Sequence, residues 1–271
     1  MAFGLEYAVQ KNLLKKALAL ITIVLFGTFL TVQNYRQQKT WHNSETLWSS
    51  AIQQYPDAYY PYLARGRAYN NLNKQQKAYQ DFNKSISLQP NSEAFYERGL
   101  LYEASGELDL ALRDYLAATS GKLPYPKARV NAASIYAKRG QLDRALKELT
   151  LAISEDPEYS LAYFNLAIVY KIQNKPERAL SNIQKAVSLD PDNIKYVEIL
   201  AAIYTDLKNY PNAIKNFKRV LNDNPKNGVA QYYLGLNYHF LNRKAEARQH
   251  FSKAISLNYA VPKAIVIEYN L

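Results

Sequence analysis

The chain has 271 residues, of which 48% are hydrophobic, and a formal net charge of +11 at pH 7. It contains no cysteine, which excludes disulfides, a thiolate nucleophile and Cys-ligated zinc. Lys and Arg outnumber Asp and Glu by 34 to 23, and this excess favours acidic partners or anionic lipid surfaces.

The N-terminal segment, residues 1–39, is predicted to be a membrane anchor. Residues 17–32 form a run without a charge, and it extends back to Leu13 because Lys15 and Lys16 can reach the lipid headgroups. A span over about residues 13–32 is long enough to cross a bilayer. A cleaved signal peptide is disfavoured because no small-x-small cleavage site follows the run. A buried repeat helix is disfavoured because the run is hydrophobic all round.

The charges beside the predicted span indicate its orientation. Lys11, Lys15 and Lys16 precede it, whereas Arg36 and Lys39 follow it. By the positive-inside rule, this small difference places the N-terminus in the cytoplasm. We therefore expect a single-pass membrane protein whose remaining residues lie on the non-cytoplasmic side, periplasmic or lumenal.

Residues 40–58 repeat part of a pattern found later in the chain. Ser44 and Trp48 lie 34 residues before Ala78 and Phe82, which belong to the second helix of a predicted repeat. This segment is therefore predicted to be the second helix of a degenerate repeat, whose first helix would be the end of the membrane span. No Gly/Pro/Ser-rich spacer intervenes, so a continuous helical connection to the bilayer is expected.

The clearest repeat unit is residues 160–191. An apolar stripe at helical spacing runs from Tyr163 to Tyr170, and Pro176 then suits the first turn of a new helix. A second apolar stripe includes Ala179 and Ile183. The unit is predicted to be two amphipathic helices joined by a short turn.

The landmarks of this unit recur at a spacing of 33 or 34 residues. The aromatic landmark of the first helix is Tyr69, Tyr102, Tyr136, Tyr170, Tyr204 and Tyr238. The small landmark of the second helix is Ala78, Ala111, Ala145, Ala179, Ala213 and Ala247. Six repeats are therefore expected over residues 59–259, with starts at Tyr59, Ser92, Pro126, Ser160, Ile194 and Gly228. Residues 260–271 are predicted to cap the last repeat, and a contact with another chain is the alternative.

This order of landmarks resembles the tetratricopeptide repeat family, with its W-x2-L-G-x2-Y, A-x3-F and P pattern. The resemblance implies an all-α fold, a right-handed α-solenoid of helix pairs, here preceded by one transmembrane helix. The family's Trp is absent, and its position is taken by Tyr62, Phe95, Arg129, Tyr163, Val197 and Gln231. The polar residues Arg129 and Gln231 leave the local packing open.

No constellation of catalytic residues is apparent. His42, His239 and His250 lie in different units, and none has a carboxylate or second histidine at metal-ligand or triad spacing. The glycines are dispersed and form no phosphate-binding loop. We therefore expect a protein that is not an enzyme and that has no cofactor and no metal site.

Binding is the function that remains. In the family that the repeats resemble, the first helix of each pair lines a concave groove. The candidate peptide-binding residues are Tyr60, Arg67, Tyr96, Asn131, Phe164, Asn165, Lys195, Tyr232 and Tyr233. Their rings would stack on an extended peptide, and Asn131 and Asn165 would bind its amides. Asn165 with Lys195 resembles only part of the clamp by which some members hold a C-terminal carboxylate.

The basic excess is concentrated late in the chain. It comprises Lys208, Lys215, Lys218, Arg219, Lys226, Arg243, Lys244, Arg248 and Lys253, most of them in second helices. A solvated face is the default interpretation, and contact with anionic lipid is the alternative. Nucleic acid is not an expected partner.

Two functions remain open at this point. The first is a membrane-anchored, non-catalytic scaffold that binds protein or peptide partners. The second follows from residues 31–69, which resemble the junction between span and repeats in transmembrane-and-tetratricopeptide protein O-mannosyltransferases and their bacterial relatives. That resemblance implies the acceptor-recognition part of a larger membrane glycosyltransferase.

Overall fold

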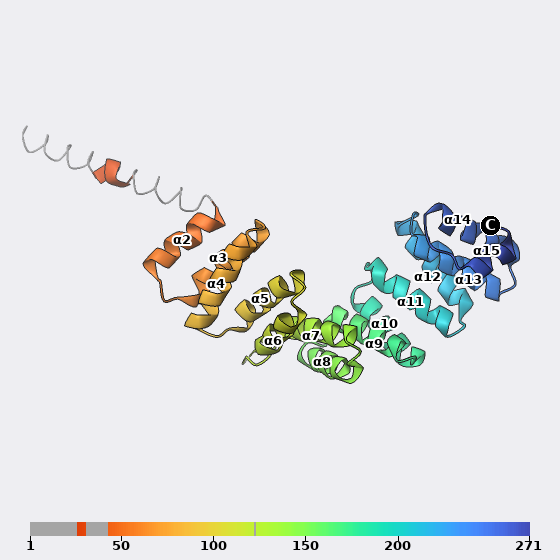
Figure 1. Ribbon diagram of the computed structural model, residues 1–271, viewed down its shortest axis with the longest axis horizontal. Helices are drawn as coiled ribbons and strands as arrows, with labels where there is room; N and C mark the ends of the chain where they lie inside the picture. The colour runs from red at the N-terminus through yellow and green to blue at the C-terminus, as the bar shows by residue number, and fades with distance from the viewer. Residues whose placement is uncertain (1–25, 31–42, 122) are drawn as a thin grey trace, which may run out of the picture. The chain divides into compact units, whose positions relative to one another are not determined.

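The computed structural model describes residues 26–30, 43–121 and 123–271, and the secondary structure in these residues is helical (Figure 1). After the short helical segment 26–30, the helices are α2 Ser44–Gln54, α3 Tyr59–Asn71, α4 Gln75–Leu88, α5 Ser92–Ala104, α6 Leu108–Ala118, α7 Pro126–Lys138, α8 Leu142–Glu155, α9 Ser160–Ile172, α10 Pro176–Leu189, α11 Ile194–Asp206, α12 Tyr210–Asp223, α13 Gly228–Phe240, α14 Lys244–Ser256 and α15 Lys263–Tyr269. They fall into two compact units that divide between Leu101 and Tyr102.

The predicted membrane span, residues 13–32, lies outside the described residues except for residues 26–30. His42 also lies outside them. Among the described helices, none is both long enough and apolar enough to cross a membrane. Phe26, Phe29 and Leu30 belong to the described helical segment, and their side chains are exposed.

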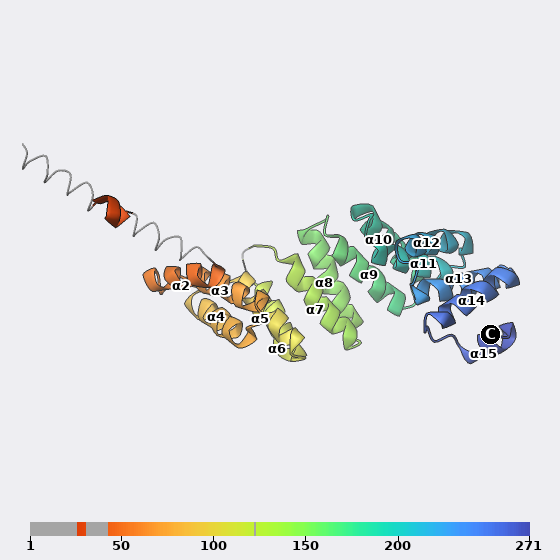
Figure 2. The ribbon, with the colours of Figure 1, turned by 90° about the horizontal axis from the view of Figure 1, so that it is seen from above.

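The array consists of helix pairs that pack side by side. Within the pairs, α3 packs on α4, α7 on α8, α9 on α10, α11 on α12 and α13 on α14. Figures 1 and 2 show the later pairs following one another along the second unit. The first helices begin at Tyr59, Ser92, Pro126, Ser160, Ile194 and Gly228, the residues at which the 34-residue spacing predicts the repeats to start.

The turn inside each repeat explains why the landmark tyrosine sits where the first helix ends. A residue with positive φ follows each first helix, namely Asn73, Gly106, Gly140, Asn174, Lys208 and Asn242. The N–H of the next residue donates to the carbonyl of the landmark tyrosine, with N···O distances of 2.8–2.9 Å in all six repeats. This left-handed turn with its backward hydrogen bond satisfies an otherwise unpaired helix carbonyl.

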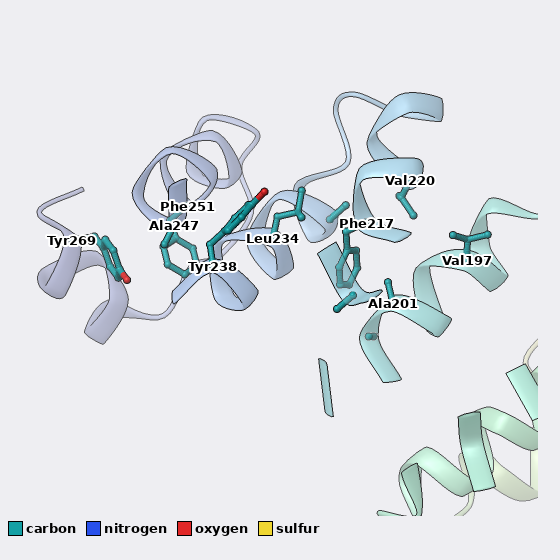
Figure 3. Close-up of a cluster of buried hydrophobic side chains, with 12 residues drawn as sticks. Val197, Ala201, Phe217, Val220, Leu234, Tyr238, Ala247, Phe251 and Tyr269 are labelled. Atoms are coloured by element: carbon teal, nitrogen blue, oxygen red, sulfur yellow. The ribbon is translucent and has the colours of Figure 1, made fainter. Parts of the chain in front are cut away.

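Each repeat buries the small landmark of its second helix together with a larger side chain one turn later. All six landmark alanines are fully buried. The larger residues are Phe82, Tyr115, Leu149, Ile183, Phe217 and Phe251, and they are also fully buried. Figure 3 shows such side chains from α11 to α15 forming one cluster. The core is therefore built repeat by repeat, as expected of a stacked array.

The polar residues at the family's Trp position are paired with polar partners on the second helix. Arg129 donates to Glu148 at 2.8 Å and to Glu155 at 2.6 Å. The ring Nδ1 of His250 lies 2.7 Å from the Gln231 side-chain oxygen. Both pairs join positions 19 residues apart, so an ion pair and a hydrogen bond replace ring packing there.

Helix α2 is tied to the first complete repeat within the N-terminal unit. The Glu45 carboxylate accepts hydrogen bonds from the Lys74 ammonium at 2.7 Å and from the Tyr69 hydroxyl at 3.2 Å. Trp48 meets the Tyr60 ring edge to face, with centroids 5.7 Å apart. These contacts fix α2 against the start and the end of α3.

Helix α15 packs on the last repeat. Tyr269 is buried, and its ring meets Phe251 with centroids 5.3 Å apart. Its hydroxyl lies 2.7 Å from Nδ1 of His239. Figure 3 shows Tyr269 at the α14 end of the cluster, next to Ala247 and Phe251. The C-terminal residues therefore shield the apolar end of the last repeat from water.

Candidate functional site

A concavity with a volume of about 240 Å³ lies between α7 and α9 in the second unit. Its lining is Ala133, Ser134, Ala137 and Lys138 from α7, Leu149 from α8, and Asn165, Ile168, Val169 and Ile172 from α9. The lining is mainly apolar, with one amide, one hydroxyl and one ammonium group. This composition suits a ligand that brings one apolar group and some polar main chain.

Two amides of the predicted site are available to a ligand. Asn131 lies on α7 and Asn165 on α9, one repeat apart, and both are half-buried. Within the described part of the chain, neither side chain has a hydrogen-bond partner. Side-chain amides offer both donors and an acceptor, which is what an extended peptide backbone requires.

Of the nine lining residues, only Asn165 belongs to the predicted set, and Lys138 and Ile172 are two of the others. Lys138 lies seven residues after Asn131, and Ile172 lies seven after Asn165, so each is on the same helix face as its amide. Ile172 is 57% exposed. The signal for both residues was present in the sequence as an i, i+7 relation, because two turns of helix bring the chain back to one face.

Phe164, which is predicted to line the groove, is instead buried between two repeats. It is only 6% exposed, and its ring stacks on Tyr196 of α11 with centroids 4.8 Å apart. The Lys195 ammonium lies 5.5 Å from the same ring. The next repeat thus covers Phe164, and its contribution is to hold α9 against α11. Lys195 is engaged with this ring instead of forming a carboxylate clamp with Asn165.

The two tyrosines predicted on α13 pack within the last repeats. Tyr233 stacks on Phe217 with centroids 5.2 Å apart. Tyr232 lies 5.1 Å from the Tyr259 ring and 5.9 Å from the Phe251 ring. Burial raises the pKa of Tyr232, and the neighbouring Tyr259 adds to this effect. Both residues remain partly exposed.

The predicted residues of the N-terminal unit form a separate group. Tyr60 is 48% exposed beside Trp48, and Tyr96 is half-buried. The Arg67 guanidinium donates to Glu97 at 2.7 Å and to Glu93 at 2.8 Å. Because two carboxylates from α5 already hold Arg67, it joins α3 to α5 and is poorly placed to receive an anionic ligand.

Within the described residues, no group of His, Asp or Glu side chains is arranged to hold a metal ion. His239 and His250 are half-buried and contact Tyr269 and Gln231, respectively. Each histidine therefore stabilises helix packing in the last repeat.

Models of the tetratricopeptide repeat match residues 59–92, 126–159, 160–193 and 200–264, which together make up more than half of the chain. No curated protein matches the sequence. Among solved structures, the fold resembles that of the anaphase-promoting complex hetero-tetramer Cut9–Hcn1, with a TM-score of 0.66 and 18% identity. That match covers 82% of this chain, which spans only 45% of that one.

Two further solved structures match this chain over nearly the whole of their own length. YrrB, described as a repeat protein with an unusual peptide-binding site, matches with a TM-score of 0.56 and 17% identity over 68% of this chain and 95% of its own. PilF of Pseudomonas aeruginosa matches with a TM-score of 0.66 and 16% identity over 79% of this chain and 96% of its own. At these identities, the likeness concerns the fold alone.

Proposed function

Because this chain belongs to the tetratricopeptide repeat family, we propose that it is a membrane-anchored scaffold that binds a peptide or protein segment along its first helices and performs no chemistry itself. The repeat fold supports a protein-interaction role. The α7–α9 concavity is the single observation that carries the proposal for the second unit, because it combines apolar walls with the Asn165 amide, which is free to bind a peptide backbone.

The ligand is an extended segment with an apolar side chain. That side chain would enter between Ala133 and Val169, where both walls are buried and apolar. Asn131 and Asn165 would bind main-chain groups on either side of it, one amide from each repeat. Because the helices that line the groove are already fixed, few protein side chains and no loops have to be ordered when the peptide main chain binds. This lowers the entropic cost of binding and so favours affinity.

Selection from a displayed peptide library tests this groove. We expect enriched peptides to lose at least about tenfold in affinity on Ile168→Glu, because a charge would then stand against their apolar side chain. Asn165→Ala should weaken the same peptides by removing a backbone partner. Ser181→Glu, an exposed change on α10, is the matched control. Equal binding by wild type and Ile168→Glu would remove the α7–α9 concavity from the proposal.

The proposed anchor is the apolar N-terminal segment. Support comes from its uncharged run and from Phe26, Phe29 and Leu30, whose side chains are 49–61% exposed in the described helical segment. Large apolar side chains left uncovered by protein favour a lipid environment. The small excess of lysine before the run supports a cytoplasmic N-terminus, with the repeats on the non-cytoplasmic side.

Alkaline carbonate extraction of membranes from expressing cells tests the anchor. We expect the full chain to stay in the membrane pellet and the Phe26→Asp/Phe29→Asp variant to move to the supernatant, because each charge is costly in a bilayer. Release of the wild type would overturn the anchoring proposal. Protease treatment of intact spheroplasts then reports on which side the repeats lie.

A further inference from the structure

The second helices of the last two repeats present a surface that is almost purely basic. We call it the basic face, and it consists of the exposed residues Lys215, Lys218 and Arg219 on α12 and of Lys253 on α14, which occupies the position of Arg219 one repeat later. The acids on these two helices are Asp223, at the end of α12, and Glu246, which Arg243 binds. These two helices themselves therefore carry little negative charge.

This charge distribution is not a general property of the second helices. The position occupied by Asp81, Asp114 and Glu148 in the first three repeats is Asn182, Asn216 and His250 in the last three. Helix α8 carries Asp143, Glu148 and Glu155 beside its two cations. The acids at that position in the first three repeats are buried, so the exposed charge differs mainly at Asp143, whose matching positions on α12 and α14 are Pro211 and Ala245.

Two concavities on these helices share the same chemistry. The first, of about 490 Å³, is lined by Lys215, Arg219, Asn212, Asn216, Gln184, Ser188 and Tyr204, together with Val187 and Leu200. The second, of about 540 Å³, is lined by Lys253, His250, Gln231, Gln249, Ser252 and Ser256. Neither lining contains a carboxylate.

Repeat positions explain this likeness. Arg219 and Lys253 are 34 residues apart, as are Asn216 and His250, so each concavity combines a cation with a neutral hydrogen-bonding neighbour at matching positions. The Arg219 guanidinium donates to the Pro191 carbonyl, which holds it at its concavity. Cations set among amide and hydroxyl donors are suited to phosphate oxygens.

We propose that the basic face binds the phosphate headgroups of an anionic lipid surface. The cations cover two helices and two separate concavities, whereas an acidic peptide would need one continuous groove. A bilayer offers many phosphates at once, and each nearby Lys or Arg adds to the attraction. The inference rests on the proposed membrane attachment for its setting, and it adds a second contact made by the far end of the repeats.

The test uses the full chain in vesicles and a fluorophore on Ala245→Cys of α14, an exposed position outside both concavities and a unique site because the chain has no cysteine. Energy transfer to an acceptor in the lipid headgroups reports how closely α14 approaches the bilayer. We expect stronger transfer in vesicles containing about one third phosphatidylglycerol than in phosphatidylcholine alone. About 1 M salt should abolish the difference, since the Debye length then falls to about 3 Å.

Two triple variants remove the same charge from different surfaces. Lys215→Gln/Lys218→Gln/Lys253→Gln should reduce transfer to the level seen in phosphatidylcholine, whereas Lys84→Gln/Lys127→Gln/Lys147→Gln, also exposed, should not. Equal transfer in both lipids, or equal loss in both variants, would overturn the proposal. So would stronger binding to soluble polyglutamate than to vesicles at equal charge concentration, which would indicate an acidic protein partner.

Failure of the anchor is distinguishable from failure of the basic face. Flotation with phosphatidylcholine vesicles reports the anchor alone, because those vesicles carry no net charge. If the chain does not float with them but floats with phosphatidylglycerol vesicles through the basic face, the anchor is wrong and the lipid contact stands.

Discussion

Gly235 of α13 lies so close to Phe251 of α14 that a Cβ atom on Gly235 would be 2.6 Å from both Cδ1 and Cε1 of the ring. The first repeat shows the same relation, since a Cβ atom on Gly66 would be 2.6 Å from Cε1 of Phe82. Both rings are fully buried. Where the small residue is Ala133 or Ala167, its partner is the smaller Leu149 or Ile183. In these four repeats glycine accompanies phenylalanine and alanine accompanies a smaller aliphatic residue, whereas the fifth repeat buries both Ala201 and Phe217.

We predict that Gly235→Ala lowers the free energy of unfolding by about 1–3 kcal/mol, because the buried ring must shift to admit a methyl group. Phe251→Leu alone should also be destabilising, since it leaves a cavity. The double variant Gly235→Ala/Phe251→Leu has the same residue pair as Ala133 and Leu149 in the third repeat. It should lower the free energy of unfolding by less than the sum of the two single changes. Urea denaturation of the four proteins measures this coupling, and strictly additive costs would contradict it.

The turn of the fifth repeat offers a stabilising substitution. Lys208 has φ of 58° at the position that is glycine or asparagine in every other repeat. A left-handed conformation costs an ordinary residue about 1–2 kcal/mol, and asparagine tolerates it better. We therefore expect Lys208→Asn to raise the unfolding free energy by roughly 1 kcal/mol. The reverse change, Asn174→Lys, should lower it by a similar amount, and no change in either variant would refute the argument.

The ion-paired triad of the third repeat should be sensitive to the loss of its cation. The side chains of Arg129, Glu148 and Glu155 are only 12–17% exposed, and within the described residues Oε2 of Glu155 has no hydrogen-bond partner. Removing one member of a buried ion pair leaves an uncompensated charge. We predict that Arg129→Met costs about 3–5 kcal/mol, measured by chemical denaturation at neutral pH.

The fourth repeat supplies the matched control for that prediction. Its residues at the three positions are Tyr163, Asn182 and Leu189. The variant Arg129→Tyr/Glu148→Asn/Glu155→Leu replaces all three charges together, so we expect it to be at least as stable as wild type. A triple variant as unstable as Arg129→Met would show that the charges themselves are needed.

Much of the fold could be read from the sequence because each repeat encodes its own turn and core. Landmarks such as Tyr170 and Ala179 recur at a fixed spacing, and a local hydrogen bond and a local contact place each of them. The replacement of the family's Trp by Arg129 was visible, but its partners were not, since Glu148 and Glu155 approach it only when the helices pair.

The candidate site was less predictable, because it depends on how neighbouring repeats cover one another. Helix periodicity put Phe164 on the same surface as Asn165, yet Tyr196 of the following repeat covers it. Ile172, by contrast, is outside the predicted set and is exposed. A one-helix pattern shows which residues share a face, while exposure is decided by the next helix in the stack.

His250 should make the stability of the last repeat depend on pH. Its Nδ1–H donates to the Gln231 oxygen at 2.7 Å, and its ring stacks on Tyr238 with centroids 5.4 Å apart. Burial lowers the pKa of His250 below its ordinary value of 6.5, and the nearby positive charge of Lys218 lowers it further, while Glu246 acts in the opposite direction. The folded state therefore takes up this proton at a lower pH than the unfolded state does.

The contribution of neutral His250 to the free energy of unfolding is fully present above about pH 6.5. It is lost as the pH falls toward the lowered pKa that His250 has in the folded state. We expect the unfolding free energy of the wild type to fall across this range more steeply than that of His250→Asn, which copies Asn216 of the preceding repeat. Lys218→Gln should make the wild-type slope shallower, because it removes a cation that opposes protonation. Denaturant titrations at neutral and mildly acidic pH measure these slopes. If His250→Asn keeps the wild-type slope, protonation of His250 is not its cause, and the titrating group must lie elsewhere in the chain.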